Sequence, residues 1–146
     1  MIPPMTYDGR HLLADLYGCP VLDDVALIDA ALRGAAERAG ATVIGLHLHH
    51  FGEGQGVTGV ALLAESHMSI HTWPEHGYAA VDIFLCGARH DPAAALDVLC
   101  RYLSPARISQ NLMRRGDISE LGEKWTASNW NVEIDCPPTI MGRDKR

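Results

Sequence analysis

The sequence predicts an α+β domain, a two-layer sandwich in which two helices cover one face of an antiparallel sheet. Three observations predict this fold. The 146 residues suffice for one domain core, and 47% apolar with 21% charged residues suits such a core. Extended and helical segments alternate in the order β-α-β-β-β-β-α-β. Two helices are too few to cover both faces of a parallel sheet, so the second face is left to a partner or a ligand.

The N-terminal part is expected to form a strand followed by a helix. Residues 10–17 have the apolar alternation of a strand. Asp23 or Asp24 can cap a helix whose apolar side chains recur at helical spacing from residue 25 to residue 39. Gly40 is a plausible stop for that helix, because glycine tolerates the left-handed conformation found after helix ends.

The middle of the chain is expected to form four strands in succession. Segment 52–56 holds three glycines in five residues and is predicted to be a loop, and Pro74 to Gly77 supply a turn. The β-rich segments on either side of these breaks predict strands over residues 41–51, 57–64, 67–73 and 78–86.

The last predicted elements are a second helix and a sixth strand. Asp91 followed by Pro92 is typical of a helix start, and the apolar pattern continues to residue 103. Residues 106–116 are expected to be a strand. We expect the functional domain to span residues 1–116 and treat residues 117–146 as a C-terminal extension of unknown role.

Charge and cysteine usage limit the classes of function. With 12 basic and 18 acidic residues the net charge is −6, which disfavours binding to nucleic acid or to anionic membranes. No apolar run reaches the roughly 18 residues that a membrane-spanning helix needs. The four cysteines form no C-x-x-C pair and are expected to be reduced. We therefore expect a cytoplasmic protein.

One candidate site is a metal centre formed by His47, His49 and Glu53. Histidines two apart on a strand point to the same face, and with a carboxylate they resemble the first metal motif of cupins. No second motif supplies a further histidine. The alternative is that these histidines line a sheet face or an interface.

A second candidate site lies in segment 65–87, ESHMSIHTWPEHGYAAVDIFLCG. Ser66, His71 and Cys86 offer a hydroxyl, an imidazole and a thiol, a set that can support nucleophilic catalysis. The spacing alone does not decide, because a cysteine at the end of an apolar strand is usually a core residue.

Three segments together resemble the prokaryotic S-adenosylmethionine decarboxylases, a pyruvoyl-dependent family of spermidine synthesis. They are GRHLLADLYGC (9–19), HHFGEGQGVTGVALLAESH (49–67) and the segment 65–87 already quoted. The resemblance covers about residues 9–110. The tail after residue 117 is longer than the family pattern, and nothing is carried over to it.

The resemblance implies that the protein makes its own cofactor by cleaving the Glu65–Ser66 bond. Ser66 Oγ attacks the Glu65 carbonyl to form an ester, and removal of the Ser66 α-hydrogen expels the Glu65 carboxylate. Hydrolysis then leaves a pyruvoyl group derived from Ser66 and releases ammonia. His71 matches the family's base for the elimination, and Thr58 matches a position, usually serine, that assists cleavage.

The resemblance also implies how substrate is bound and turned over. The pyruvoyl carbonyl forms a Schiff base with the substrate amine, and Cys86 matches the family's proton donor. Phe51 and Trp73 lie near positions that contact the nucleoside, although loop 52–56 is one residue longer than the family pattern. Glu75 matches a carboxylate that accepts both ribose hydroxyls. Aromatic rings suit the adenine and the sulfonium.

The partners implied are S-adenosylmethionine and a second copy of the chain. Family members pair as dimers of processed protomers, so we expect a homodimer with sites at or near its interface. An alternative within the same scaffold is a pyruvoyl-dependent decarboxylase of arginine or ornithine. The alternative from another class is the metal-binding module with His47, His49 and Glu53.

Overall fold

The structure, a computed structural model, describes residues 9–116, which form one six-stranded sheet and two helices. The helices are α1 (Val25–Arg38) and α2 (Pro92–Leu103), with a short 3₁₀ turn η1 at Pro74–His76. The strands are β1 (Gly9–Tyr17), β2 (Val43–His50), β3 (Val57–Leu63), β4 (Ser66–Trp73), β5 (Tyr78–Cys86) and β6 (Arg107–Arg115). Their order in the sheet is β2-β3-β4-β5-β1-β6, and every neighbouring pair is antiparallel.

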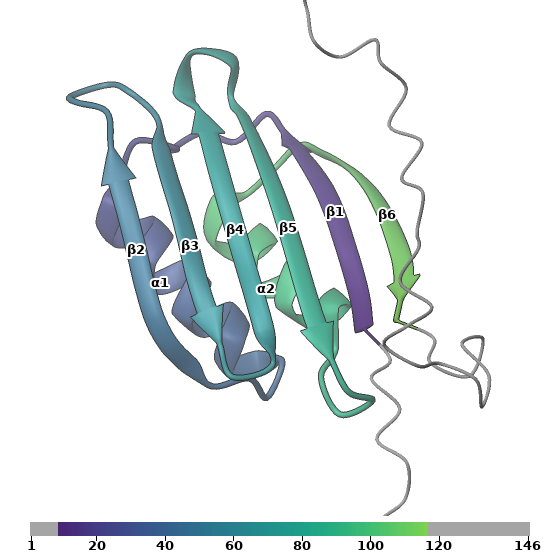
Figure 1. Ribbon diagram of the computed structural model, residues 1–146. Helices are drawn as coiled ribbons and strands as arrows, with labels where there is room; N and C mark the ends of the chain where they lie inside the picture. The colour runs from purple at the N-terminus through teal and green to yellow at the C-terminus, as the bar shows by residue number, and fades with distance from the viewer. Residues whose placement is uncertain (1–8, 117–146) are drawn as a thin grey trace, which may run out of the picture.

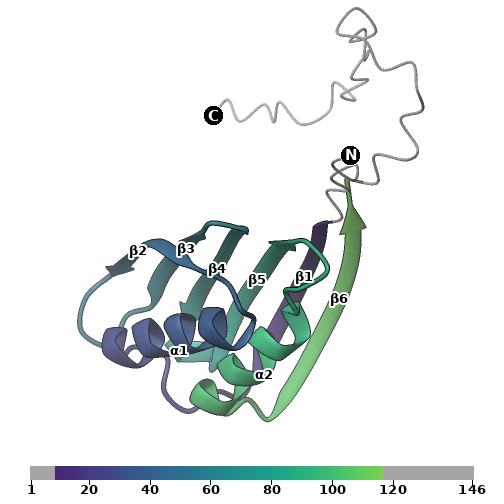
Figure 2. The same cartoon turned by 90° about the horizontal axis from the view of Figure 1, so that it is seen from below.

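Both helices pack on the same face of this sheet, so the predicted two-layer α+β sandwich is confirmed (Figures 1 and 2). Alternation along β4 shows the two faces: Met68, Ile70 and Thr72 are buried towards the helices, whereas His71 and Trp73 are exposed. The core between the layers includes Ile28, Leu32, Ile83 and Leu99, each 0% exposed. The opposite face, which we call the open face, carries no helix of residues 9–116.

The helices begin where the sequence indicates. The Asp24 carboxylate accepts a hydrogen bond of 3.1 Å from Leu27 N–H, so Asp24 rather than Asp23 is the cap of α1. Asp91 accepts from Ala93 N–H at 2.9 Å, with Pro92 in the first turn of α2. Each cap satisfies a backbone donor that the helix itself leaves without a partner.

Several strand boundaries differ from the predicted ones by one or two residues. β4 begins at Ser66, one residue earlier than predicted, because Ser66 pairs with Leu63 on one side and Leu85 on the other. β2 begins at Val43, two residues later than predicted. Within residues 9–116, no helix is long and apolar enough to cross a membrane. The predicted extension 117–146 lies outside the described residues.

Candidate active site

Five of the predicted site residues line one cavity of about 350 Å³ at the end of the open face where β2 meets the loop before β3. We call it the upper cavity, because the β2–β3 and β4–β5 connections that contribute to its lining lie at the top of Figure 1. Its lining includes Phe51, Thr58, His71, Trp73 and Glu75. The structure therefore brings the predicted nucleoside contacts together with two of the residues expected to assist cleavage.

Thr58 and His71 form a direct pair in this cavity. They lie opposite each other in the β3–β4 ladder, and Thr58 Oγ1 is 3.1 Å from His71 Nδ1. The His71 ring also lies 6.4 Å, centroid to centroid, from the Trp73 ring. A hydroxyl fixed against an imidazole can be activated by it or can orient it, so the pair is suited to proton transfer.

A buried threonine fixes the loop that closes the upper cavity. Thr72 Oγ1 accepts a hydrogen bond from Val57 N–H and donates one to the Leu22 carbonyl, both at 2.8 Å. Gly56 lies so close that an added Cβ would stand 2.0 Å from the Thr72 carbonyl oxygen. Only glycine fits there, and this close contact sets where the loop enters β3.

A row of aromatic rings on the open face supports Trp73. Trp73 stacks on Tyr78 at 5.2 Å, Tyr78 stacks on Tyr17 at 5.4 Å, and the Arg107 guanidinium lies 4.2 Å from the centre of the Tyr17 ring. The Tyr78 hydroxyl donates to Asp15 Oδ1 at 2.5 Å. This hydrogen bond, with some desolvation, raises the pKa of Tyr78 to about 12. Four strands are thus linked beside the upper cavity.

The predicted cleavage residues lie at the other end of the sheet. Glu65 lies in the turn from β3 into β4, at the lower edge in Figure 1, and Ser66 is the first residue of β4. The Glu65 carbonyl accepts a hydrogen bond of 3.0 Å from Cys86 N–H. Cys86 is thereby placed directly beside the Glu65–Ser66 bond, at the end of the neighbouring strand β5.

The structure does not bring Ser66 and His71 together within one chain. Both lie on β4, and five residues of extended strand span about 16 Å. The predicted site residues therefore form two groups at opposite ends of the sheet, which we call half-sites: Glu65, Ser66 and Cys86 at one end, Thr58 and His71 at the other.

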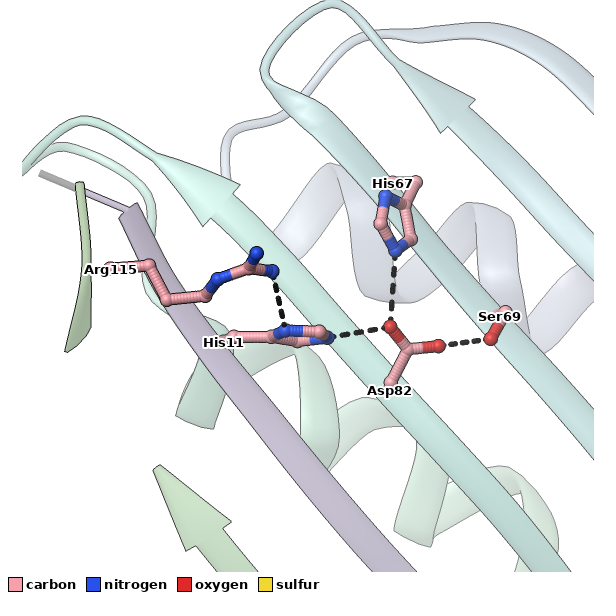
Figure 3. A network of polar contacts seen from close by, with 5 residues as sticks. All are labelled: His11, His67, Ser69, Asp82 and Arg115. Atoms are coloured by element: carbon pink, nitrogen blue, oxygen red, sulfur yellow. Dashed lines mark hydrogen bonds and ion pairs between the residues drawn. The ribbon is translucent and has the colours of Figure 1, made fainter. Parts of the chain in front are cut away.

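Between the half-sites lies a polar network centred on Asp82 (Figure 3). Asp82 Oδ2 is 2.7 Å from His11 Nε2 and 3.1 Å from His67 Nε2, and Asp82 Oδ1 accepts from the Ser69 hydroxyl. Arg115 Nη1 lies 3.2 Å from His11 Nδ1. Partial burial works to raise the pKa of Asp82, but the hydrogen bonds from Ser69, His11 and His67 outweigh it, and the pKa lies below its ordinary value.

This network could not be predicted from the sequence, since its members come from four strands. The signal available was a single aspartate, Asp82, inside the otherwise apolar strand 78–86. A second signal was the polar alternation of His67, Ser69 and His71 on β4.

The network also contains the one group within residues 9–116 whose donor atoms could hold a metal ion, His11, His67 and Asp82. An arginine can only donate, so the Arg115 contact makes His11 Nδ1 the acceptor and leaves the proton on Nε2, facing Asp82. These atoms are thus already used in hydrogen bonds, and we assign no metal to them.

The predicted metal centre of His47, His49 and Glu53 is not assembled, because these three do not form such a group in the described part of the chain. His49 instead packs edge-on against Phe51, with ring centroids 4.6 Å apart. The alternative interpretation, in which His47 and His49 line a sheet face, fits their exposure on β2.

Residues 10–116 match the family model described as S-adenosylmethionine decarboxylase. The chain is 54% identical over 97 residues to the S-adenosylmethionine decarboxylase proenzyme of Prochlorococcus marinus (strain MIT 9313), covering 65% of this chain and 77% of that protein. It is 45% identical over 118 residues to the proenzyme of Methanococcus aeolicus, covering 80% and 100%. The crystal structure of the adenosylmethionine decarboxylase from Aquifex aeolicus VF5 aligns with a TM-score of 0.70 at 44% identity, covering 76% of this chain and 92% of that chain.

Proposed function

This chain belongs to the S-adenosylmethionine decarboxylase family, and from that premise we propose that it decarboxylates S-adenosylmethionine with a pyruvoyl group made from its own Ser66. The products are S-adenosylmethioninamine, which serves spermidine synthesis, and CO₂. The observation that carries the proposal is the 3.0 Å hydrogen bond between Cys86 N–H and the Glu65 carbonyl. This hydrogen bond joins Cys86, the expected proton donor, to the carbonyl group of the Glu65–Ser66 bond, which is the bond expected to be cleaved. A cytoplasmic location stays a prediction.

The self-cleavage uses only the chain's own groups and one water molecule. Ser66 Oγ adds to the Glu65 carbonyl and the amide nitrogen leaves, which converts the peptide bond to an ester. A base takes the Ser66 α-hydrogen, and Glu65 leaves as a carboxylate. Water then releases ammonia from the new terminus and leaves a ketone. The Cys86 N–H already points at the carbonyl oxygen that becomes negative in the first step, so it can stabilise that charge.

The base for this reaction is proposed to come from a second copy of the chain. His71 is the family's matching base, but in its own chain it lies about 16 Å along the strand from Ser66. In the proposed homodimer the open faces of the two sheets pack together, with the β4 strands of the two chains running in opposite directions. The Thr58–His71 pair of one chain then lies next to Ser66 and Cys86 of the other chain. The uncovered sheet face and the two separated half-sites support this arrangement.

The surroundings of Ser66 fit a pyruvoyl group, because Cys86 N–H bonds the carbonyl of the preceding residue, Glu65, and the following residue, His67, bonds Asp82 in the polar network. When formed, that group supplies a carbonyl that withdraws the electrons left behind by CO₂. Cys86 then gives a proton to the substrate carbon, a role that requires the thiol to reach the open face. Cys86 is partly exposed and is a free thiol.

The upper cavity is proposed to hold the nucleoside part of the substrate. Phe51 and Trp73 are 62% and 40% exposed, so aromatic surface is available for stacking on adenine or contacting the sulfonium. Glu75 lines the same cavity and is suited to accept both ribose hydroxyls. A substrate without a ribose has no use for this carboxylate.

The experiment that tests the substrate compares CO₂ release from S-adenosylmethionine, arginine and ornithine by wild type and by Glu75→Ala. Each hydrogen bond to a charged group is worth about 1.5–3 kcal/mol, so Glu75→Ala should weaken S-adenosylmethionine binding at least tenfold. His76→Ala, a change of the next side chain in η1, is the matched control and should bind normally. Faster turnover of arginine or ornithine than of S-adenosylmethionine would contradict the substrate assignment and favour the amino-acid decarboxylase alternative.

A further inference from the structure

The backbone at Ser66 has a conformation that favours glycine. Its φ is 145°, in a range that residues with a Cβ rarely adopt. Only one other non-glycine residue among 9–116 has a positive φ, and that one, Ser104, closes helix α2 with a φ of 49°. Tight hairpins normally place positive φ on the turn residues themselves. In this hairpin Ala64 and Glu65 form the turn, yet the positive φ falls on the next residue, Ser66.

The turn before Ser66 is held by three hydrogen bonds. The Glu65 carboxylate accepts from Thr42 N–H at 3.0 Å, and the Glu65 backbone carbonyl accepts from Cys86 N–H at 3.0 Å. The neighbouring Ala64 N–H donates to the Thr42 carbonyl at 2.9 Å. The turn is thus tied to the segment before β2 on one side and to the end of β5 on the other, which fixes the Glu65 peptide group.

The residue after Ser66 is held through its side chain. His67 Nε2 bonds Asp82 Oδ2 at 3.1 Å, and its ring packs edge-on against Phe84, centroids 5.9 Å apart. Asp82 cannot move to follow His67, because His11 and Ser69 also donate to its carboxylate and Arg115 holds His11 in turn (Figure 3). The Asp82 side chain is only 20% exposed, so these hydrogen bonds are partly shielded from water and are stronger than they would be at the surface.

We infer that the Asp82 network, acting through His67, is a positioning device that keeps the Ser66 backbone strained for self-cleavage. The inference rests on the proposed self-cleavage and adds two positioning residues, Asp82 and His67, to it. With Glu65 fixed on one side, Ser66 can relax to an ordinary extended φ only if His67 rotates away. The strained rotation at Ser66 is about the bond between its amide nitrogen and its Cα. Conversion of the Glu65–Ser66 peptide bond to an ester frees that nitrogen from Glu65, so the strain favours attack of Ser66 Oγ on the Glu65 carbonyl.

The strain itself is tested in chains that cannot cleave. Ser66→Gly and Ser66→Ala both lack the hydroxyl, so their melting temperatures can be compared at one protein concentration. Glycine in a strand is ordinarily less stable than alanine. Here we expect Ser66→Gly to melt higher, because glycine adopts a φ of 145° freely. An alanine variant that melts at or above the glycine variant would overturn the inference.

The role of Asp82 is tested by adding Asp82→Asn to each of these two variants. If the network maintains the strain, Asp82→Asn should reduce the amount by which Ser66→Gly melts higher than Ser66→Ala, or should make the alanine variant the more stable of the two. Asp15→Asn is the matched control, since Asp15 is another open-face carboxylate that accepts a hydrogen bond, and it should leave the difference intact. His67→Gln, which removes the ring, gives a second route to the same result if Asp82→Asn fails to fold. A difference unchanged by both variants would overturn the assignment.

The link to cleavage is tested in the chain that retains Ser66. We expect Asp82→Asn and His67→Gln to cleave at least tenfold more slowly than wild type while melting cooperatively as folded proteins. Cleavage at the wild-type rate, with the strain difference already lost, would show that the network does not serve the reaction. Absence of cleavage in wild type would instead contradict the proposed function, and the glycine–alanine comparison would still test the strain.

Discussion

Cys86 contributes two different atoms to the half-site around Ser66. Its backbone N–H bonds the Glu65 carbonyl, whereas its thiol is the proposed proton donor. Cys86→Ala removes the thiol and keeps the N–H. We therefore expect self-cleavage to proceed, while CO₂ release by the cleaved protein falls about 10²–10⁴-fold, the usual effect of a positioned proton donor.

Cys100→Ala provides the control for this experiment. Cys100 is also a partly buried free thiol, but it lies on α2, on the helix side of the sheet. Its loss should leave both cleavage and turnover unchanged. Wild-type turnover by fully cleaved Cys86→Ala would show that the Cys86 thiol is not the proton donor.

At the scale of elements, the ring of Tyr78 joins β5 to β1 through Asp15, and this contact has a pH signature. The folded pKa of Tyr78 is about 12, above its ordinary value of 10.0. The stabilising contribution is thus complete below pH 10 and is lost as pH rises from 10 to 12, because the unfolded chain loses the proton first. Urea unfolding of wild type should therefore show stability falling more steeply across this interval than that of Tyr78→Phe.

Tyr102→Phe is the control for the pH experiment, since Tyr102 is an exposed tyrosine on α2. It should keep the steep loss of stability seen in wild type. Asp15→Asn should remove it, because the hydrogen bond to Asp15 is the main cause of the raised pKa. Parallel pH curves for wild type and Tyr78→Phe would contradict the assignment.

The elements could be predicted from the sequence because local rules define them. Asp24 and Asp91 cap helices through residues two or three positions away, and strand alternation needs only neighbours. The sheet order could not be predicted, because it depends on contacts distant in sequence. β1 lies between β5 and β6, so His11 meets Phe84 on one side and Met113 on the other.

The candidate site was predictable only as a set of residue types. The motif identified Ser66, His71 and Cys86, but not that an extended strand would separate the first two by about 16 Å. The network around Asp82 escaped prediction for the same reason as the sheet order. Its bonds join residues 71 positions apart, as in the pair of His11 and Asp82.

In the whole molecule, mixing two variant chains tests whether the site is formed by residues of both chains of the homodimer. Ser66→Ala and His71→Ala chains should each stay uncleaved alone. Co-expressed, they form some mixed dimers in which one site combines Ser66 of the second chain with His71 of the first. We expect the His71→Ala chain to be cleaved in that mixture, as seen on a denaturing gel with chains of different tag length.

Complementation of this kind requires that the site draw on both chains. A mixture in which neither chain is cleaved, although mixed dimers are recovered by their tags, would contradict the shared site. Co-expression of Ser66→Ala with the wild-type chain is the positive control, and its wild-type chain should be cleaved. The expected homodimer can be measured on the same samples by sedimentation.

Self-cleavage between Glu65 and Ser66 is tested by the mass of the purified protein under denaturing conditions. We expect two fragments, residues 1–65 ending in a free carboxylate and residues 66–146 beginning with a pyruvoyl group in place of serine. The larger fragment should resist Edman degradation because it has no free amine. Ser66→Ala should remain one chain of 146 residues. A wild-type protein that keeps its full intact mass after long incubation would show that the chain does not cleave itself.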